Sequence, residues 1–69
     1  MKYNLSKLAG HIIKHRASMK LSREVLAKHA KVNYNTIIKL ESGANKNPTV
    51  KTLIGLAGVF KTSIEKLIS

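Results

Sequence analysis

Two short helical patterns lie close together within residues 22–42, and this closeness limits how the chain can fold. Ser22 is a suitable N-cap for a helix over 23–30, because its hydroxyl can accept a hydrogen bond from a free backbone N–H. Asn33 can cap a second helix over 34–42 in the same way. Only three residues separate the two patterns, so a tight turn must join the two helices.

The turn between these helices has the features of a helix-turn-helix motif. Two helices joined by only residues 31–33 must cross steeply, and the small side chain of Ala27 suits such a crossing. Gly43 stands where a left-handed stop of the second helix is expected. We therefore predict a helix-turn-helix over about 22–42, whose second helix can enter a DNA major groove.

Three further helical patterns flank this motif. We predict a first helix over about 4–17, a fourth from the cap Thr49 to about Phe60, and a short last helix from Ser63. No segment of useful length alternates with period two, so the predicted class is all-α with five helices. The residues predicted to form the apolar faces are Leu5, Leu8, Ile12, Met19, Val25, Leu26, Ala30, Val32, Ile37, Leu40, Leu53, Ile54, Leu56, Ala57, Val59, Ile64, Leu67 and Ile68.

The chain is short, and its composition excludes several kinds of stabilisation and chemistry. Its 69 residues predict one domain over 1–69, and domains of this size are marginally stable. There is no cysteine, so neither a disulfide nor a thiolate zinc site can assist folding. His11 and His15 have a spacing that zinc can bridge, but no third ligand is convincing. We predict no metal, no cofactor and no enzyme activity, since the sequence shows no catalytic grouping.

The charge balance favours a polyanionic partner. Thirteen lysines and arginines face only three acidic residues, which gives a net charge of +10. Such an excess attracts nucleic acid, although a basic solubilising surface is the alternative. The sequence contains neither an apolar run of membrane-spanning length nor a secretory signal pattern, so we predict a cytoplasmic protein that does not enter a membrane. A basic amphipathic element on an anionic membrane surface is a weaker alternative.

Two segments resemble a known family. LSREVLAKHAKVNYNTIIKLESG (21–43), followed by Pro48 and TLIGLAGVFKTSIEKLI (52–68), is similar to the Cro/CI, or XRE-type, helix-turn-helix regulators. The likeness covers nearly the whole chain. It implies a compact five-helix, lambda-repressor-like domain that binds operator DNA, usually as a dimer.

Three positions depart from the family pattern. Lys31 occupies a turn position where glycine is usual, and a lysine with positive φ is strained by about 1 kcal/mol. Arg23 replaces a common glutamine and keeps the ability to contact a phosphate. His15 stands where an apolar residue is usual, so we expect looser packing of the first helix there.

The resemblance implies that the third helix contacts bases through Tyr34, Asn35, Ile38 and Lys39. Asn35 can pair with adenine, Lys39 can donate to guanine, and Ile38 and the Tyr34 ring can pack on a thymine methyl. Tyr34 and Ile38 could instead cover the core, and Ile38 could face a partner protein. The residues predicted to contact the DNA backbone are Ser22, Arg23, Asn33, Asn45, Lys46 and Asn47.

The resemblance also implies a structural role for one of the few acidic residues. Glu41 lies in the last turn of the predicted third helix, where a negative charge is unfavourable. In the family this glutamate pairs with an arginine of the first helix, and Arg16 is at the matching position. We predict an Arg16–Glu41 ion pair, which would withdraw Arg16 from DNA contact.

The predicted function is a sequence-specific DNA-binding transcriptional regulator, of the repressor type, that binds an inverted-repeat operator in double-stranded DNA. We expect a homodimer, either in free solution or only on DNA, with contacts from Phe60, Thr62 and Ile68. The alternative is an antitoxin or another protein-interaction module of the same fold, which holds a partner protein. An exposed Ile38 and the C-terminal Leu67 and Ile68 favour that alternative.

Overall fold

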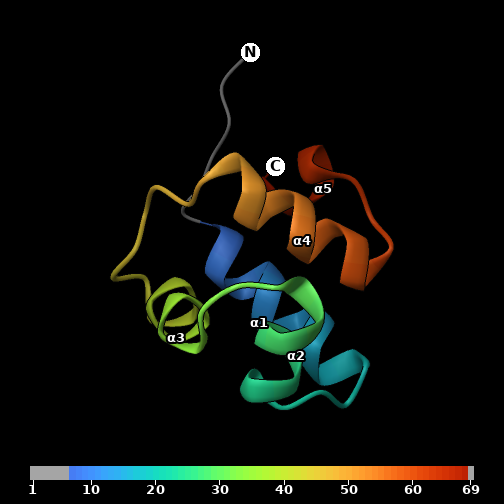
Figure 1. The fold of residues 1–69 in the computed structure, drawn as a ribbon. Coiled ribbons are helices and arrows are strands. Elements are labelled where there is room, and N and C mark those ends of the chain that lie inside the picture. The colour runs from blue at the N-terminus through green and yellow to red at the C-terminus, as the bar shows by residue number, and fades with distance from the viewer. Residues whose placement is uncertain (1–6, 69) are drawn as a thin grey trace.

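Five helices follow one another in the computed structural model, which describes residues 7–68 (Figure 1). No strand occurs in that part of the chain, and the prediction of an all-α fold with five helices is confirmed. The predicted start of the first helix lies outside the described residues, and its end is one residue later than predicted. The helices are α1 Leu8–Ser18, α2 Arg23–Ala30, α3 Tyr34–Ser42, α4 Val50–Phe60 and α5 Ile64–Ile68.

The starts of four helices depend on side-chain caps that the sequence predicted. Ser22 accepts a hydrogen bond from the backbone N–H of Val25 at 3.1 Å, and Asn33 accepts one from Asn35 at 2.8 Å. Thr49 caps α4 through the N–H of Thr52 at 3.1 Å. Before α5, the hydroxyl of Ser63 accepts from the N–H of Lys66 at 3.1 Å. Each cap satisfies a backbone donor that the first turn of a helix leaves free.

The ends of the helices use left-handed backbone, mostly at lysine. Gly43 ends α3 with φ 83°, as predicted. Lys31 ends α2 with φ 58°, which confirms the strained turn, and Lys61 ends α4 with φ 55°. Lys20, just after α1, has φ 57°. A side chain in this region costs roughly 1–2 kcal/mol, so three helix ends store a small strain.

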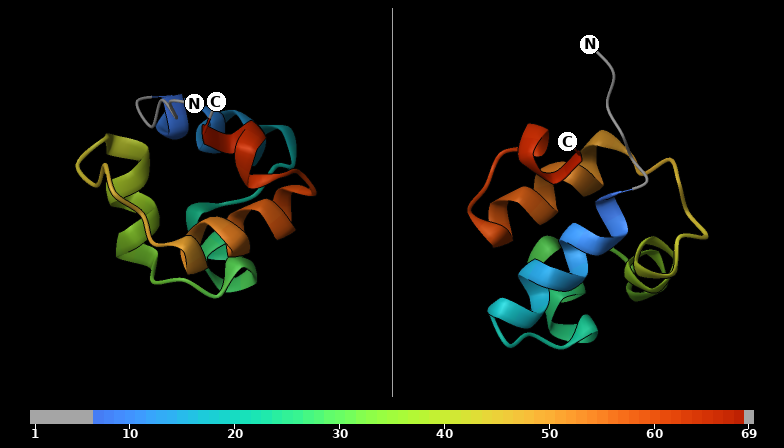
Figure 2. Two further views of the ribbon diagram at one scale, coloured as in Figure 1. Left: turned by 90° about the horizontal axis from the view of Figure 1, so that it is seen from above. Right: turned by 180° about the vertical axis from the view of Figure 1, so that it is seen from behind.

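The helices surround one apolar core, with α3 at one side of the molecule. Figures 1 and 2 show α3 apart from α4 and α5, whereas α1 runs across the back of the molecule. α3 packs on α1 and α2, α5 packs on α1 and α4, and α2 packs on α4. The buried apolar residues are Leu8, Ile12, Leu26, Ala27, Ala30, Ile37, Leu40, Leu53, Leu56, Ala57, Phe60, Leu67 and Ile68.

Three residues that we predicted on the apolar faces lie at the surface instead. Met19, Val25 and Ile54 are exposed, and their prediction as core residues was wrong. Met19 follows the last turn of α1, where the chain turns away from the core. Ile54 lies beside the buried stripe of α4, and Val25 lies beside the buried stripe of α2. Helical spacing predicts an apolar side of a helix, but not how wide a strip its neighbours cover.

Phe60, Leu67 and Ile68 are buried, which removes two earlier expectations about the surface. Phe60 and Ile68 pack in the core of the protein itself, so neither offers the dimer contact that we predicted. Leu67 is fully buried, and with Ile68 it gives no apolar surface to a partner protein.

None of the helices in residues 7–68 has the length and hydropathy needed to cross a membrane.

A glycine permits α4 to approach α2 closely. A methyl group added at Gly55 would overlap the backbone carbonyl oxygen of Ala30, the last residue of α2. Because backbone cannot move aside as a flexible side chain can, this crossing requires the absence of a side chain. Gly58, one turn later on α4, has no atom within 4 Å of an added methyl group.

These two glycines give a matched test of the crossing. We predict that Gly55→Ala destabilises the protein by about 2 kcal/mol, because the new methyl group forces α2 and α4 apart. Gly58→Ala should be neutral or stabilise the protein by up to about 1 kcal/mol, because alanine favours a helix. Urea unfolding followed by circular dichroism measures both values. Equal stability of the two variants would contradict a tight α2–α4 crossing.

Candidate nucleic-acid interface

α3 is held against the molecule by one side and exposes the other. Ile37 and Leu40 are fully buried, and Val32 in the preceding turn packs against the same core. The turn itself is closed by a hydrogen bond from the N–H of Val32 to the carbonyl oxygen of Ala27 at 3.0 Å. This places α3 across α2 as a helix-turn-helix requires.

The predicted base-contacting residues share the outer side of α3, although not equally. Tyr34 is 42% exposed, and Asn35 and Lys39 are also exposed. Ile38 is only partly exposed, so it partly covers the core edge as well as facing outward. We call these four residues the outward face of α3. It combines an amide, an ammonium and two apolar groups, which are the groups that contact base edges.

The predicted backbone-contacting residues lie at the two flanks of this face. Ser22 and Arg23 begin α2, and the ion pair of Arg23 with Glu41 brings that start beside the last turn of α3. On the other side, the loop after α3 folds back, since the N–H of Asn45 donates to the carbonyl oxygen of Lys39 at 3.0 Å. Lys46 is exposed in this loop.

The side-chain oxygens of two of the predicted asparagines already accept hydrogen bonds from backbone N–H groups of the protein itself. Asn33 Oδ1 caps α3, and Asn45 Oδ1 accepts from the N–H of Asn47 at 2.9 Å. In both residues the side-chain amide nitrogen is the group suited to donate to a phosphate. Asn47 is itself exposed.

The carboxylate of Glu41 joins three helices. Arg16 of α1 donates from Nε to Glu41 Oε2 at 2.7 Å and from Nη2 to Oε1 at 3.1 Å. Arg23 of α2 donates from Nε to the same Oε1 at 2.9 Å. Arg16 also donates to the carbonyl oxygen of Leu21 at 3.1 Å, which ties the loop before α2 to the cluster. We call Arg16, Arg23 and Glu41 the Glu41 cluster.

The cluster is buried on one side and open on the other. The side chain of Glu41 is 3% exposed, that of Arg16 is 19% exposed and that of Arg23 is 48% exposed. Burial of the carboxyl raises the pKa of Glu41, but the hydrogen bonds and charges of the two arginines outweigh it and hold the pKa below its ordinary value. The hydrogen bond and charge of Glu41 raise the pKa of Arg23.

The second arginine of the cluster is the feature that sequence reasoning missed. We predicted only Arg16 as the partner of Glu41 and assigned Arg23 to a phosphate. In the structure, the Nε of Arg23 donates a hydrogen bond to Glu41, and about half of the Arg23 side chain remains exposed to solvent. The sequence contained a signal for this second contact. Arg23 stands where the family commonly has a neutral glutamine, and the chain offers only three acidic partners for an arginine.

The histidines have structural contacts. His15 stacks on Phe60 with ring centroids 5.0 Å apart, so the looser packing that we expected at this position was wrong. His11 Nδ1 donates to the carbonyl oxygen of Leu67 at 2.7 Å and ties α1 to α5. Within residues 7–68, no three histidine or acidic side chains gather closely enough to hold a metal ion.

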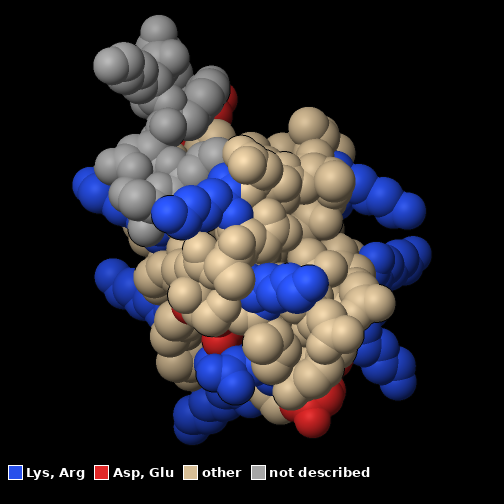
Figure 3. All heavy atoms as spheres, turned by 90° about the vertical axis from the view of Figure 1, so that its left-hand side faces the viewer, with Lys and Arg blue, Asp and Glu red and all other residues tan. Residues whose placement is uncertain are grey.

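Basic side chains surround the side of the molecule on which α3 lies. Figure 3 shows this side, with lysine and arginine side chains projecting around its edges and one across its middle. Acidic atoms are visible there at the lower edge and beside the basic side chains, whereas most of Glu41 is buried between two arginines. On this side, the positive charge is spread over the surface and is not confined to one patch.

Comparison with known proteins agrees with this geometry. A helix-turn-helix family model matches residues 12–67. The chain belongs to this helix-turn-helix family. The match confirms the resemblance to Cro/CI-type regulators that the sequence indicated. Among curated proteins, no sequence gives a significant match.

Two solved structures share the fold of this helix-turn-helix chain. One is the N-terminal DNA-binding domain of SinR from Bacillus subtilis, with 23% identity, a TM-score of 0.85 and 88% of each chain covered. The other is SinR, a master regulator for biofilm formation, in complex with DNA. It has 23% identity and a TM-score of 0.83, and covers 87% of this chain and 95% of its own.

The Glu41 cluster should contribute strongly to stability. We predict that Glu41→Ala lowers the free energy of unfolding by about 3 kcal/mol, because it leaves Arg16 largely buried without its carboxylate. Arg23→Ala should lower the free energy of unfolding clearly less, because Arg23 is half exposed and Glu41 retains its ion pair with Arg16. Urea unfolding at neutral pH compares the two. Equal losses would show that burial does not determine the strength of these contacts.

The cluster also predicts how stability depends on acid. The pKa of Glu41 is lower in the folded protein than its unfolded value of about 4.3. Its stabilisation is therefore complete above the unfolded pKa and is lost as the pH falls through the folded pKa. We expect Glu41→Gln to flatten the loss of stability that begins as the pH falls below about 4.3. Glu65→Gln is the matched control and should leave that loss unchanged, because it removes an exposed carboxylate of α5 that neither arginine of the cluster contacts.

Proposed function

We propose that this protein is a sequence-specific DNA-binding transcriptional regulator that places α3 in the major groove. The observation that supports the proposal most is the outward face of α3, on which Tyr34, Asn35 and Lys39 are exposed, while Ile37 and Leu40 on the opposite side are buried. A related fold, SinR, has been solved in complex with DNA. The net charge of +10 supports a polyanionic partner.

The side chains suggest a division of roles. Asn35 would pair with adenine and Lys39 with guanine, while Tyr34 and Ile38 would pack on thymine methyl groups. The residues proposed to contact phosphates are Ser22, Arg23, Asn33, Asn45, Lys46 and Asn47. The Glu41 cluster would support this arrangement by holding the exposed part of Arg23 beside α3. Arg16 belongs to that support and would not contact DNA.

The finer proposal is a cytoplasmic repressor that binds an inverted repeat as a homodimer. Two copies related by a two-fold axis would present two α3 helices to successive major grooves. Thr62 is the one predicted dimer contact that is not in the core, since Phe60 and Ile68 are buried. A role as an antitoxin that holds a partner protein loses the support that Leu67 and Ile68 were expected to give.

The test measures affinity for a DNA site selected from a random pool by the wild-type protein. We predict that Asn35→Ala and Lys39→Ala each weaken binding by about tenfold or more, because each removes contacts worth about 1–3 kcal/mol. The exposed lysine of α5 offers the control, because Lys66→Ala removes the same charge far along the chain from α3. If about six phosphates are neutralised, the logarithm of the affinity should fall against log salt with a slope of about −5.

Equal affinity of the wild type, Asn35→Ala and Lys39→Ala for the selected site would refute base contact by α3. Loss of binding in Lys66→Ala as large as in Lys39→Ala would indicate that charge alone determines affinity. Circular dichroism of each variant shows whether the fold is intact.

A further inference from the structure

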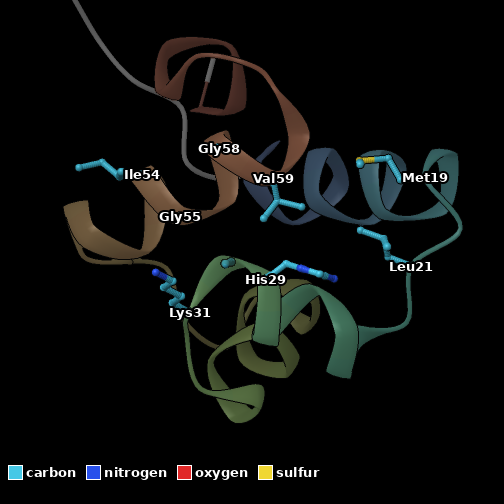
Figure 4. Close-up of a pocket in the computed structure, with 9 residues that line it drawn as sticks. Met19, Leu21, His29, Lys31, Ile54, Gly55, Gly58 and Val59 are labelled. Atoms are coloured by element: carbon cyan, nitrogen blue, oxygen red, sulfur yellow. The ribbon is translucent and has the colours of Figure 1, made fainter.

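A groove lies between α2 and α4, away from the outward face of α3. Its volume is about 490 Å³, which is within the range of ligand pockets. In Figure 4, Ile54 and Lys31 lie toward one end and Met19 and Leu21 toward the other, with Val59 and His29 between them. No residue of α3 lines it. The lining residues are Met19, Leu21, His29, Ala30, Lys31, Ile54, Gly55, Gly58 and Val59.

The groove exposes large apolar side chains that the fold does not use. Met19 is 43% exposed and Ile54 is 58% exposed. Val50, four residues before Ile54 and therefore on the same side of α4, is also exposed. Between Ile54 and Met19, the groove is also lined by the partly buried Leu21 and Val59 (Figure 4). We call Met19, Leu21, Val59 and Ile54 the apolar strip of the groove.

Two glycines leave the floor of the groove without side chains. Gly55 is required by the α2–α4 crossing, but Gly58 is not, since an added methyl group there meets nothing within 4 Å. A helix could therefore approach the α4 backbone closely at Gly58. The space beside this residue belongs to the groove and is not needed for packing.

The charges around the groove determine which partner fits. Its charged or titratable lining residues are Lys31 and His29, and Lys20 stands between Met19 and Leu21 in the sequence. No acidic residue lines it, and Glu41 is occupied by two arginines elsewhere. A second copy, with a net charge of +10, would bring like charges together here. An acidic partner would instead bring opposite charges to this rim.

We propose that the α2–α4 groove binds a short acidic amphipathic helix of another protein. The apolar side chains of the partner helix contact the apolar strip from Met19 to Ile54, and its carboxylates face Lys31 at the rim. This is a helix-in-groove mode of recognition, with small floor residues that permit close approach. The groove and the outward face of α3 share no residue, so the partner and DNA do not compete for the same side chains.

The test uses a synthetic peptide of about 16 residues, a length that can form a helix. Leucines at helical spacing form one side, and glutamates fill the others. Titration of the full ¹⁵N-labelled chain, followed by NMR, should shift the amide signals around Met19, Ile54 and Gly58. A scrambled peptide of the same composition and a peptide with lysine in place of glutamate should bind at least about tenfold more weakly.

Variants of the groove separate this site from the rest of the surface. Gly58→Leu adds an apolar side chain to the groove at a position where an added Cβ meets no atom within 4 Å. Ile54→Glu places a like charge against the acidic peptide. Each should weaken peptide binding by about tenfold or more while the variant stays folded by circular dichroism. Ile13→Glu is the matched control, because Ile13 is a similarly exposed isoleucine on α1 that does not line the groove. It should leave peptide affinity unchanged.

Three outcomes would overturn the proposal. Equal binding of the scrambled peptide would show attraction by charge alone. Shifts confined to α3, unchanged in Gly58→Leu, would show that the peptide imitates DNA at the outward face. Sedimentation that shows a wild-type dimer, lost in Gly58→Leu, would assign the groove to a second copy. None of these outcomes depends on whether α3 binds a specific DNA sequence.

Discussion

The carboxylate of Glu41 is the point at which three helices meet, and the position of α3 depends on it. Apolar packing of Ile37 and Leu40 holds α3 to the core, but such contacts are not directional. The two hydrogen bonds from Arg16 and the one from Arg23 set the rotation of the last turn of α3 against α1 and α2. In a small chain without disulfides, this cluster supplies directional contacts that a small core lacks.

The sequence predicted the elements well because the information for them is local. Four helices are preceded directly by a residue with a short polar side chain, namely Ser22, Asn33, Thr49 and Ser63. The oxygen of each side chain accepts a hydrogen bond from a backbone N–H of the first turn. The strain at Lys31 was predicted because the family pattern has glycine at this turn position, and the structure gives Lys31 a positive φ. The family resemblance added the inward partner of Glu41, which no local pattern contains.

What the sequence could not predict depends on contacts between distant residues. The need for glycine at position 55 arises only when α4 lies on the carbonyl oxygen of Ala30. Met19 and Ile54 match helical spacing as well as buried residues do, and only the arrangement of neighbouring helices leaves them exposed. The residues of the outward face of α3 were predicted from the sequence, whereas the partial burial of Ile38 is known only from the structure.

The left-handed lysines have a consequence for how the protein responds to ionic strength. A glycine at Lys31 or Lys61 would remove backbone strain, but it would also remove a positive charge from a helix C-terminus, where the helix dipole favours cations. The strain is therefore offset in part by electrostatics, and salt screens this contribution over a distance of about 8 Å at physiological ionic strength. Salt also screens the repulsion among the surplus lysines. The ends of α2 and α4 should therefore loosen in salt even where the rest of the domain tightens, so that one ion concentration acts in opposite directions on two parts of a 69-residue chain.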